Sequence, residues 1–349
     1  MIIAVVISFL MIIISFFFKR SRFVALMLFF FMWLLFGWNY MNGDYLGYEN
    51  MFAYNEFEIS LKGYEAGFKS LMMFFLLKGY NFQSFFIAIS AVILLLLYFF
   101  IIKTSKYPAF ISAVFFVFYF PLDYVILRNF LAFVLILQGF VLVFKNKKYS
   151  KFFFALIVAL ACTMHISSVF YFFFLFAFQE FKIDYKKIVL LIIFGLIIYI
   201  PLKVHIFNYF LADVSEKNEV YSNSFHLFIF LSIVQIINFL FMKYVIKLDT
   251  SHFQIKQNIN SIYIYNINLI LVLLIVFYFD MAIFVRVFRN MSLLNIIYTT
   301  NLILSVKDCK TKKIVLFLLL YLVFFYLFFI VPVFDNTLHS LYKYNVIFN

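Results

Sequence analysis

The stretch FQSFFIAISAVILLLLYFFII, residues 82–102, carries no charged side chain, and as a helix it is long enough to cross the hydrocarbon core of a bilayer. Apolar runs recur along the chain, and 67% of the 349 residues are hydrophobic whereas only 12% are charged. A soluble domain is about half apolar and about a quarter charged. Because this much apolar surface needs lipid as its solvent, the sequence predicts an all-α, polytopic transmembrane bundle and excludes a soluble globular protein.

The apolar runs predict about ten membrane spans, each bounded by charged or polar loops. The candidate runs are 1–18, 23–38, 82–102, 109–121, 125–144, 188–209, 226–242, 261–279, 283–305 and 314–333. No linker rich in Pro, Gly or Ser divides the chain, so we expect residues 1–349 to form a single integral membrane domain. The first run lacks a basic n-region and a cleavage site, which favours a retained span over a signal peptide.

The basic residues predict the orientation of the spans, because short loops rich in Lys and Arg stay on the cytoplasmic side. This rule places the loops at 19–22, 103–106 and 145–151 inside. The segment 39–81 then becomes an outer loop with an interfacial helix. The formal charge of +13 comes from such scattered clusters and not from a basic tail or an aromatic-basic module, which argues against a nucleic-acid partner.

The apolar run 152–178 admits two topologies. If it crosses once, the acidic loop 210–225 becomes cytoplasmic and Lys243 and Lys247 become external. If it enters the membrane and returns, the later loops obey the charge rule. We therefore predict a re-entrant hairpin with its tip near residues 164–167, where non-helical backbone must be buried in protein or line a wet cavity.

Ionisable side chains in or beside the spans gather at the predicted outer ends, and such residues often mark functional sites. Arg128 lies one turn inside its run. Arg286 and Arg289 lie near the start of theirs and share one helix face because of their i,i+3 spacing. His165 is at the predicted hairpin tip. Carboxylates on the same predicted side are Asp44, Glu65, Asp123 and Asp280.

This combination of side chains is suited to handling a pyrophosphate. Arginine presents a planar fork of donors that matches phosphate oxygens. A nearby histidine or carboxylate can deprotonate a sugar hydroxyl. Together these groups indicate glycosyl transfer from a lipid-linked diphosphate, with the arginines stabilising the leaving group.

Each side chain also has an ordinary interpretation. An arginine near a helix end can extend to the interface, and a membrane histidine can be a hydrogen bonder between packed helices. A loop carboxylate can simply be solvated. Position in the chain alone does not separate these interpretations from a functional site.

Short blocks spread over the chain carry a family pattern. They are NGDYLGY (42–48), GYEAG (63–67), LRNFLA (127–132), ALACTMHIS (159–167), VRVFR (285–289) and YKYNVIF (342–348). This spaced set resembles the EpsG family of membrane proteins, which belongs with the Wzy-type O-antigen and capsule polymerases. The chain departs from the common pattern at Asn129, where relatives often have Gln, and at Ile166, where they often have Pro.

The resemblance implies a glycosyltransferase at the outer face of the bacterial cytoplasmic (inner) membrane. It would transfer a growing glycan from polyprenyl diphosphate to a newly flipped lipid-linked repeat unit, and so build O-antigen, capsule or exopolysaccharide. No cofactor is expected because the donor is already activated, and no metal because a D-x-D motif is missing. Besides the lipid-linked oligosaccharide and membrane lipid, the expected partners are a flippase and a chain-length regulator.

The resemblance also implies roles for particular residues. The group that positions or deprotonates the acceptor hydroxyl is one of three candidates, namely His165, Asp44 and Glu65. Substrate binding is assigned to Arg128, Arg286, Arg289, Tyr45 and Tyr64.

A lipid-linked oligosaccharide flippase is an alternative, and a membrane O-acyltransferase is another. A transporter spreads polar residues through the membrane depth, often with internal repeats, whereas this chain shows no repeat and its charges gather on one side. An O-acyltransferase needs a histidine that a cytoplasmic acyl donor can reach, which an outward His165 disfavours. A purely structural subunit leaves the three arginines unexplained.

Overall fold

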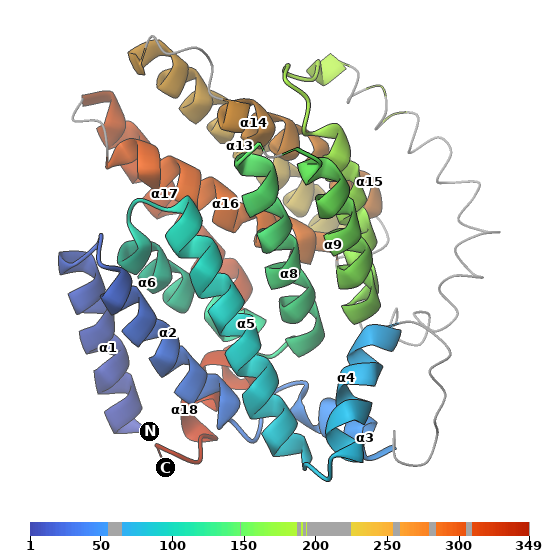
Figure 1. Ribbon diagram of the computed structural model, residues 1–349. Helices are drawn as coiled ribbons and strands as arrows, with labels where there is room; N and C mark the ends of the chain where they lie inside the picture. The colour runs from blue at the N-terminus through green and yellow to red at the C-terminus, as the bar shows by residue number, and fades with distance from the viewer. Residues whose placement is uncertain are drawn as a thin grey trace. The chain divides into compact units, whose positions relative to one another are not determined.

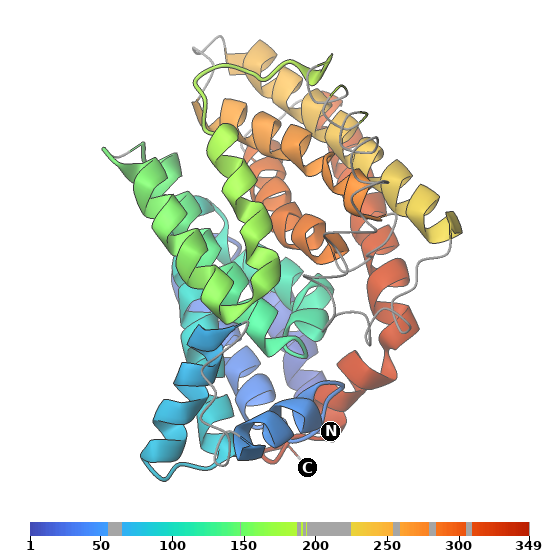
Figure 2. The same ribbon diagram turned by 90° about the vertical axis from the view of Figure 1, so that its right-hand side faces the viewer.

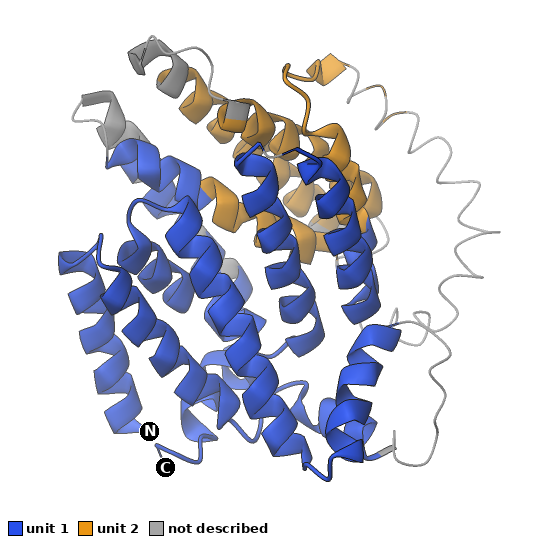
Figure 3. Ribbon diagram, viewed as in Figure 1, with its two compact units in different colours: residues 1–169, 296–349 blue, residues 170–295 orange. Residues whose placement is uncertain are grey.

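The computed structural model describes residues 1–54, 65–146, 148–186, 225–253, 259–278, 284–304 and 309–348, together with positions 190 and 193. These residues form helices and no β-strand, which confirms the predicted all-α class (Figure 1). The chain groups into two compact units (Figure 3). Unit 1 comprises residues 1–169 and 296–349, and unit 2 comprises residues 170–295. The single membrane domain over 1–349 stays a prediction.

Unit 1 is a helical bundle whose long helices run alternately up and down (Figure 1). Helix α2 packs against α5 and α6, and α8 packs against α5 and α9. The elements of this unit are α1 (Ile2–Phe17), α2 (Arg22–Gly37), α3 (Tyr45–Tyr54), α4 (Ala66–Leu77), α5 (Phe82–Thr104), α6 (Pro108–Phe118), α7 (Phe120–Asp123), α8 (Leu127–Phe144), α9 (Ser150–Met164), α17 (Cys309–Phe325), η4 (Tyr326–Ile330), η5 (Val331–Val333), η6 (Asp335–His339) and α18 (Ser340–Lys343).

Unit 2 contains most of the 3-10 helix η1 (Ile166–Phe176), with α13 (Phe225–Phe253), α14 (Ile259–Leu271), α15 (Leu274–Tyr278) and the first half of α16 (Val285–Ile303). Its interior holds buried amides. The side chains of Asn238, Asn268 and Asn295 hydrogen-bond one another at N–O distances between 2.7 and 3.4 Å. Such bonds hold membrane helices together, because lipid offers these groups no alternative partner.

Among the described residues, four helices are long and apolar enough to cross a membrane by themselves. They are Phe82–Thr104, Leu127–Phe144, Phe228–Leu248 and Asn260–Tyr278. Shorter apolar helices include α1, α2 and α6. The apolar helices mark the chain as a membrane protein, but the expected count of about ten spans is not confirmed. The candidate run 188–209 lies outside the described residues apart from two positions.

Local sequence explains where several helices begin and end. The side chains of Ser21 and Asn81 accept hydrogen bonds from the backbone N–H groups of Val24 and Ser84, at 3.2 and 2.9 Å. These bonds cap α2 and α5, since the first N–H groups of a helix have no partner within it. The predicted run 109–121 is not one helix, because α6 ends at Phe118 and α7 begins at Phe120 with proline in its first turn.

Unit 1 separates its basic turns from the ends of the helices that carry most candidate site residues. The turns near residues 18–22 and 104–108 meet, because the Phe110 N–H donates to the Lys19 carbonyl at 3.4 Å. The turn between α8 and α9 lies at the same end, here called the basic end (Figure 1). The end of α2 and the starts of α5 and α8 lie at the opposite end. The charge rule predicts this segregation.

The predicted re-entrant run 152–178 is broken at its expected tip. Helix α9 ends at Met164, and His165 has extended backbone with φ −153° and ψ 124° before η1 begins. The return of the whole run to one membrane face stays a prediction, as does the interfacial position of α4 within 39–81.

Candidate functional site

The hairpin of α8 and α9 explains why Arg128 and His165 come together. The two helices are antiparallel neighbours in both views (Figure 1, Figure 2), so the first turn of α8 lies level with the end of α9. Their packing is close, since a Cβ atom added to Gly139 would lie 2.8 Å from the ring of Phe154. Arg128, in the first turn of α8, therefore meets His165, the first residue after α9.

Glu65 is brought to the same place by a second close helix contact. A Cβ atom added to Gly67 would clash with the Thr163 hydroxyl and would lie 2.8 Å from the Thr163 Cβ. Only glycine lets the start of α4 approach the end of α9 this closely. Glu65 itself precedes α4 with left-handed backbone, φ 66° and ψ 33°, which turns its side chain towards His165.

The Glu65 carboxylate bridges two basic side chains. Its Oε1 lies 2.5 Å from Nδ1 of His165, and its Oε2 accepts a hydrogen bond from Nη1 of Arg128. The side chains of Glu65, His165 and Arg128 are only 10%, 12% and 23% exposed. Arg128 also lies over the ring of Tyr48, at 5.4 Å from its centroid. Three residues that the sequence singled out thus form one partly buried group, here called the Glu65 cluster.

Electrostatics within the Glu65 cluster fix its protonation. Burial raises the pKa of the Glu65 carboxyl, but the hydrogen bond with His165, the charge of Arg128 and the Ile166 backbone bond outweigh it, and the pKa is lowered. The carboxylate is therefore ionised at neutral pH. A carboxylate beside Nδ1 holds the imidazole proton there and leaves Nε2 as an acceptor.

Two nitrogen atoms of the Glu65 cluster are buried and have no hydrogen-bond partner in the described part of the chain. They are Nε2 of His165 and Nε of Arg128. Buried polar atoms are satisfied in most proteins, so each exception needs an explanation. A bound substrate that brings a hydroxyl and an anion would supply both partners.

Helix α3 supplies the candidates next to the cluster. Asp44 is exposed just before α3, while Tyr45 and Tyr48 are buried on it. Burial raises the pKa of Tyr48, Arg128 lowers it and Asp44 raises it, with a raised value as the result. The pKa of Tyr45 is raised to about 12, mainly by burial and to a smaller extent by the negative charge of Glu49. The Tyr45 hydroxyl donates to the Gln83 Oε1 at 2.8 Å, so it attaches α3 to α5 and its role in binding substrate stays a prediction.

The remaining candidates do not belong to this cluster as the structure describes it. Tyr64 and Asp280 lie outside the described residues. Arg286 and Arg289 belong to α16 in unit 2, where Arg289 is buried and Arg286 is half-buried. Their participation in one site with Arg128 stays a prediction. In the described residues, no three His, Cys, Asp or Glu side chains come together as metal ligands would.

Sequence reasoning missed several contributors to the cluster. Tyr48 lies within a quoted block, but no spacing rule places its ring beneath Arg128. Gly67 gave only the weak signal of a glycine at the start of an apolar run. Asn129 donates to the Ser167 hydroxyl at 3.4 Å and so joins α8 to the segment after His165. These contacts are tertiary, and residue type alone does not reveal them.

Comparison with known proteins decides the family. The sequence pattern that defines the EpsG family matches residues 22–346, which is nearly the whole chain. The chain belongs to the EpsG family. No curated protein and no solved structure matches it. The EpsG family consists of Wzy-type polymerase-like membrane proteins, so membership indicates a membrane protein of polysaccharide biosynthesis with polymerase-type activity. The resemblance seen in the sequence is confirmed.

Proposed function

We propose that this EpsG-family protein polymerises polyprenyl-diphosphate-linked oligosaccharide repeat units at the outer face of the bacterial cytoplasmic membrane. The product is O-antigen, capsule or exopolysaccharide. Family membership supports the class of reaction. The observation that carries the proposal is the Glu65 cluster, a partly buried base and a partly buried arginine held by one carboxylate, with an unpartnered buried nitrogen atom on each basic side chain.

His165 acts as the general base. Because the Glu65 carboxylate lies at Nδ1, the lone pair on Nε2 is available to the acceptor hydroxyl. The acceptor oxygen attacks the anomeric carbon of the donor while Nε2 takes its proton, and the bond between that carbon and the diphosphate oxygen breaks. The Glu65 carboxylate stabilises the imidazolium that forms.

Glu65 itself is a positioning residue rather than the base. Its carboxylate is engaged by His165 and Arg128 together, and its pKa is lowered, so it has little affinity for a proton at neutral pH. Asp44 is exposed at the edge of the cluster. It is the second candidate for a group that binds the acceptor sugar.

Arg128 binds the diphosphate of the donor. One guanidinium nitrogen pairs with Glu65, and Nε is left for a phosphate oxygen. Negative charge grows on the diphosphate as it leaves, and a buried guanidinium stabilises that charge more in the transition state than in the ground state. Arg286 and Arg289 are proposed to bind the same group. The diphosphate already activates the donor, so the reaction needs no cofactor.

The proposal is tested by the length of surface polysaccharide in a deletion strain. Complementation with the wild-type gene restores long chains, whereas the deletion and the Arg128→Ala variant leave single repeat units. Immunoblotting of the tagged variant checks that it reaches the membrane at the wild-type level. If the deletion instead traps lipid-linked units on the cytoplasmic side, the protein is a flippase and the proposal is wrong.

A further inference from the structure

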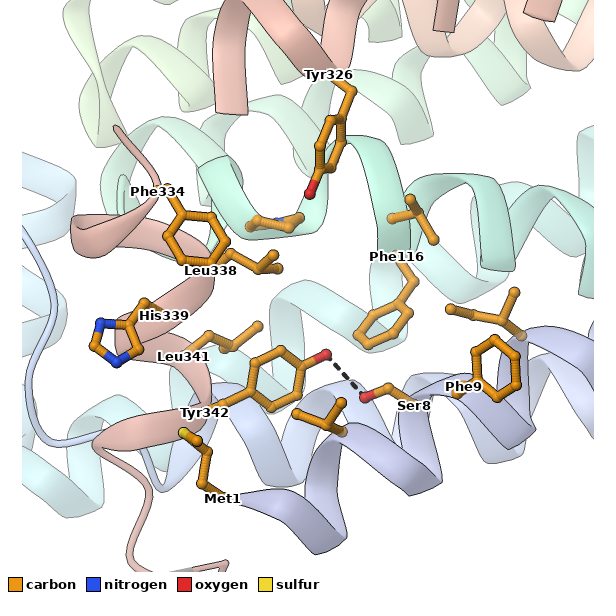
Figure 4. A pocket seen from close by; sticks show the side chains of 14 residues that line it. Met1, Ser8, Phe9, Phe116, Tyr326, Phe334, Leu338, His339, Leu341 and Tyr342 are labelled. Carbon is orange, nitrogen blue, oxygen red and sulfur yellow. Dashed lines mark hydrogen bonds between the residues drawn. The ribbon is translucent and has the colours of Figure 1, made fainter. Parts of the chain in front are cut away.

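A second feature of unit 1 lies away from the Glu65 cluster, between α1 and the C-terminal segment. It is a cavity of about 440 Å³ lined by residues of α1, α6, α7, η4, η6 and α18 (Figure 4). No residue of the Glu65 cluster lines it, and neither do Asp44, Tyr45 or Tyr48. The reaction proposed above therefore does not account for it.

The wall of the cavity is mostly apolar, and the hydroxyl groups of Ser8 and Tyr342 are satisfied. Ser8 donates to the Ala4 carbonyl at 2.8 Å, and the Tyr342 hydroxyl lies 2.8 Å from Ser8 Oγ (Figure 4). A buried water needs two to four polar partners, and apolar cavities stay dry. Water is thus a poor occupant, whereas an empty cavity of this size would forfeit the dispersion contacts of its whole lining.

The cavity opens on the surface of the bundle. Lining residues from both walls are partly exposed, with Val5 at 46%, Phe9 at 64% and Phe334 at 43%. Helix α1 exposes apolar side chains along its length, including Ile2 at 75% and Phe17 at 79%. In a membrane protein such a surface faces hydrocarbon. The liquid next to the opening consists of lipid chains.

Polar side chains lie at one edge of the apolar cavity, so the cavity is suited to an amphipathic ligand. His339 belongs to the lining, its side chain is 38% exposed, and it stands opposite Phe9 (Figure 4). Asp335 lies 3.5 Å from the His339 ring and is almost fully exposed. A chain seated among the apolar residues would leave its headgroup at this edge.

We propose that this cavity binds an acyl chain of a membrane phospholipid. The chain fills the space between α1 and the C-terminal segment and so keeps η6 and α18 in place. Through η6 the cavity is linked to α7 and α8, because the Tyr124 hydroxyl donates to the Thr337 carbonyl at 2.7 Å, and Tyr124 lies one turn before Arg128. The lipid is a bound structural component, separate from the lipid-linked substrate.

The test uses the full-length protein in proteoliposomes that contain a phosphatidylglycerol with a diazirine in one acyl chain. After photolysis, mass spectrometry maps the labelled residues. Label is expected within 5–12, 116–121 and 334–342. The Val5→Phe variant fills the cavity and is expected to lower this label several-fold. The matched control is Val6→Phe, the same change at a neighbouring exposed position outside the lining, which leaves the label unchanged.

A second variant, Val117→Phe, fills the cavity from α6 and so controls for a local effect of the Val5 substitution on α1. Equal labelling of Val5→Phe, Val6→Phe and wild type would mean ordinary lipid contact and would overturn the proposal. Absence of label from the residues that line the cavity would also overturn the proposal. Loss of the label when excess polyprenyl phosphate is added would assign the cavity to the carrier lipid instead. Loss of polymerase activity does not enter this test, so its outcome is independent of the proposed function.

Discussion

The helices of the two units are joined by different prominent side-chain contacts. In unit 1 the interior is packed by aromatic rings, and Phe36 contacts Phe86 at 5.2 Å and Phe130 at 6.2 Å between ring centroids. In unit 2 buried amides of Asn238, Asn268 and Asn295 bond one another. Lipid is as apolar as leucine, so apolar contact alone gives membrane helices little reason to associate. Aromatic packing is thus a prominent helix contact in unit 1, which also has hydrogen bonds between helices, and a three-amide network is prominent in unit 2.

The comparison also separates structure from chemistry. The amides of Asn238, Asn268 and Asn295 in unit 2 bond one another, whereas the Glu65 cluster of unit 1 leaves Nε2 of His165 and Nε of Arg128 without partners in the described residues. A network closed on itself stabilises a fold, and an incomplete one is where a ligand is expected. The network of Asn238, Asn268 and Asn295 is therefore interpreted as structural and the Glu65 cluster as functional.

The largest effect is expected from Glu65→Gln. An amide cannot neutralise Arg128, and removing one partner of a buried ion pair costs about 3–5 kcal/mol. It also frees the His165 ring to change its tautomer. Chain extension by the purified protein in proteoliposomes should fall at least about a hundredfold, as expected for loss of general base catalysis. Normal activity in a folded Glu65→Gln protein would mean that the cluster is only structural.

Gly67→Ala tests whether close packing positions the cluster. The added methyl group must push α4 away from Thr163, and overpacking of this kind costs about 1–3 kcal/mol. The carboxylate of Glu65, two residues away, should move with it and activity should fall. Gly47→Ala is the matched control, because a Cβ atom there meets nothing within 4 Å. Equal activities of the two variants would contradict the proposed positioning.

Asn268→Leu tests the amide network of unit 2. The substitution keeps the branched shape of the side chain but leaves Asn238 and Asn295 without their shared partner, which should cost about 1–2 kcal/mol. Thermal unfolding in detergent should shift to lower temperature while the rate per folded molecule changes little. Leu271→Met, a volume-conserving change at a buried apolar site of α14, serves as the control. Lost activity at unchanged stability would place the amides in the reaction.

The smallest effect concerns acid pH. Because the pKa of Glu65 is lowered in the folded protein, its contribution to stability is present above the unfolded value near 4.5 and is lost as pH falls through the lower, folded value. Thermal stability should therefore decline below about pH 4.5 more steeply in wild type than in Glu65→Gln. Parallel declines would show that another carboxylate is responsible.

The sequence predicted the helices well because long apolar runs leave few alternatives in a membrane. The runs 1–18, 82–102 and 125–144 correspond to α1, α5 and α8. The charge rule places Arg128 at the outer end of its run, and the predicted re-entrant hairpin brings His165, at its tip, to the same side. Unit 1 brings the two side chains together through Glu65. The pattern of charge, together with the hairpin chosen for 152–178, was therefore enough to predict that these two side chains lie at one end of the bundle.

Other features depend on tertiary contacts, which the pattern of apolar residues along the sequence does not reveal. The approach of Gly67 to Thr163 and the ring of Tyr48 under Arg128 join segments distant in the sequence. The break between α6 and α7 depends on local geometry at Tyr119 and Pro121. The amide network of unit 2 could have been predicted, because its asparagines lie within predicted apolar runs. Uncharged polar residues inside spans often hydrogen-bond to neighbouring helices.

Chain extension by the purified protein, with a lipid-linked repeat unit as the only substrate, shows whether the Glu65 cluster is the active site. Wild type and His165→Ala are compared at equal amounts of folded protein. If Nε2 of His165 is the general base, His165→Ala still binds the repeat unit but extends chains at least about a hundredfold more slowly. Chains of wild-type length, made by His165→Ala at the wild-type rate, would contradict the central claim that the Glu65 cluster is the active site.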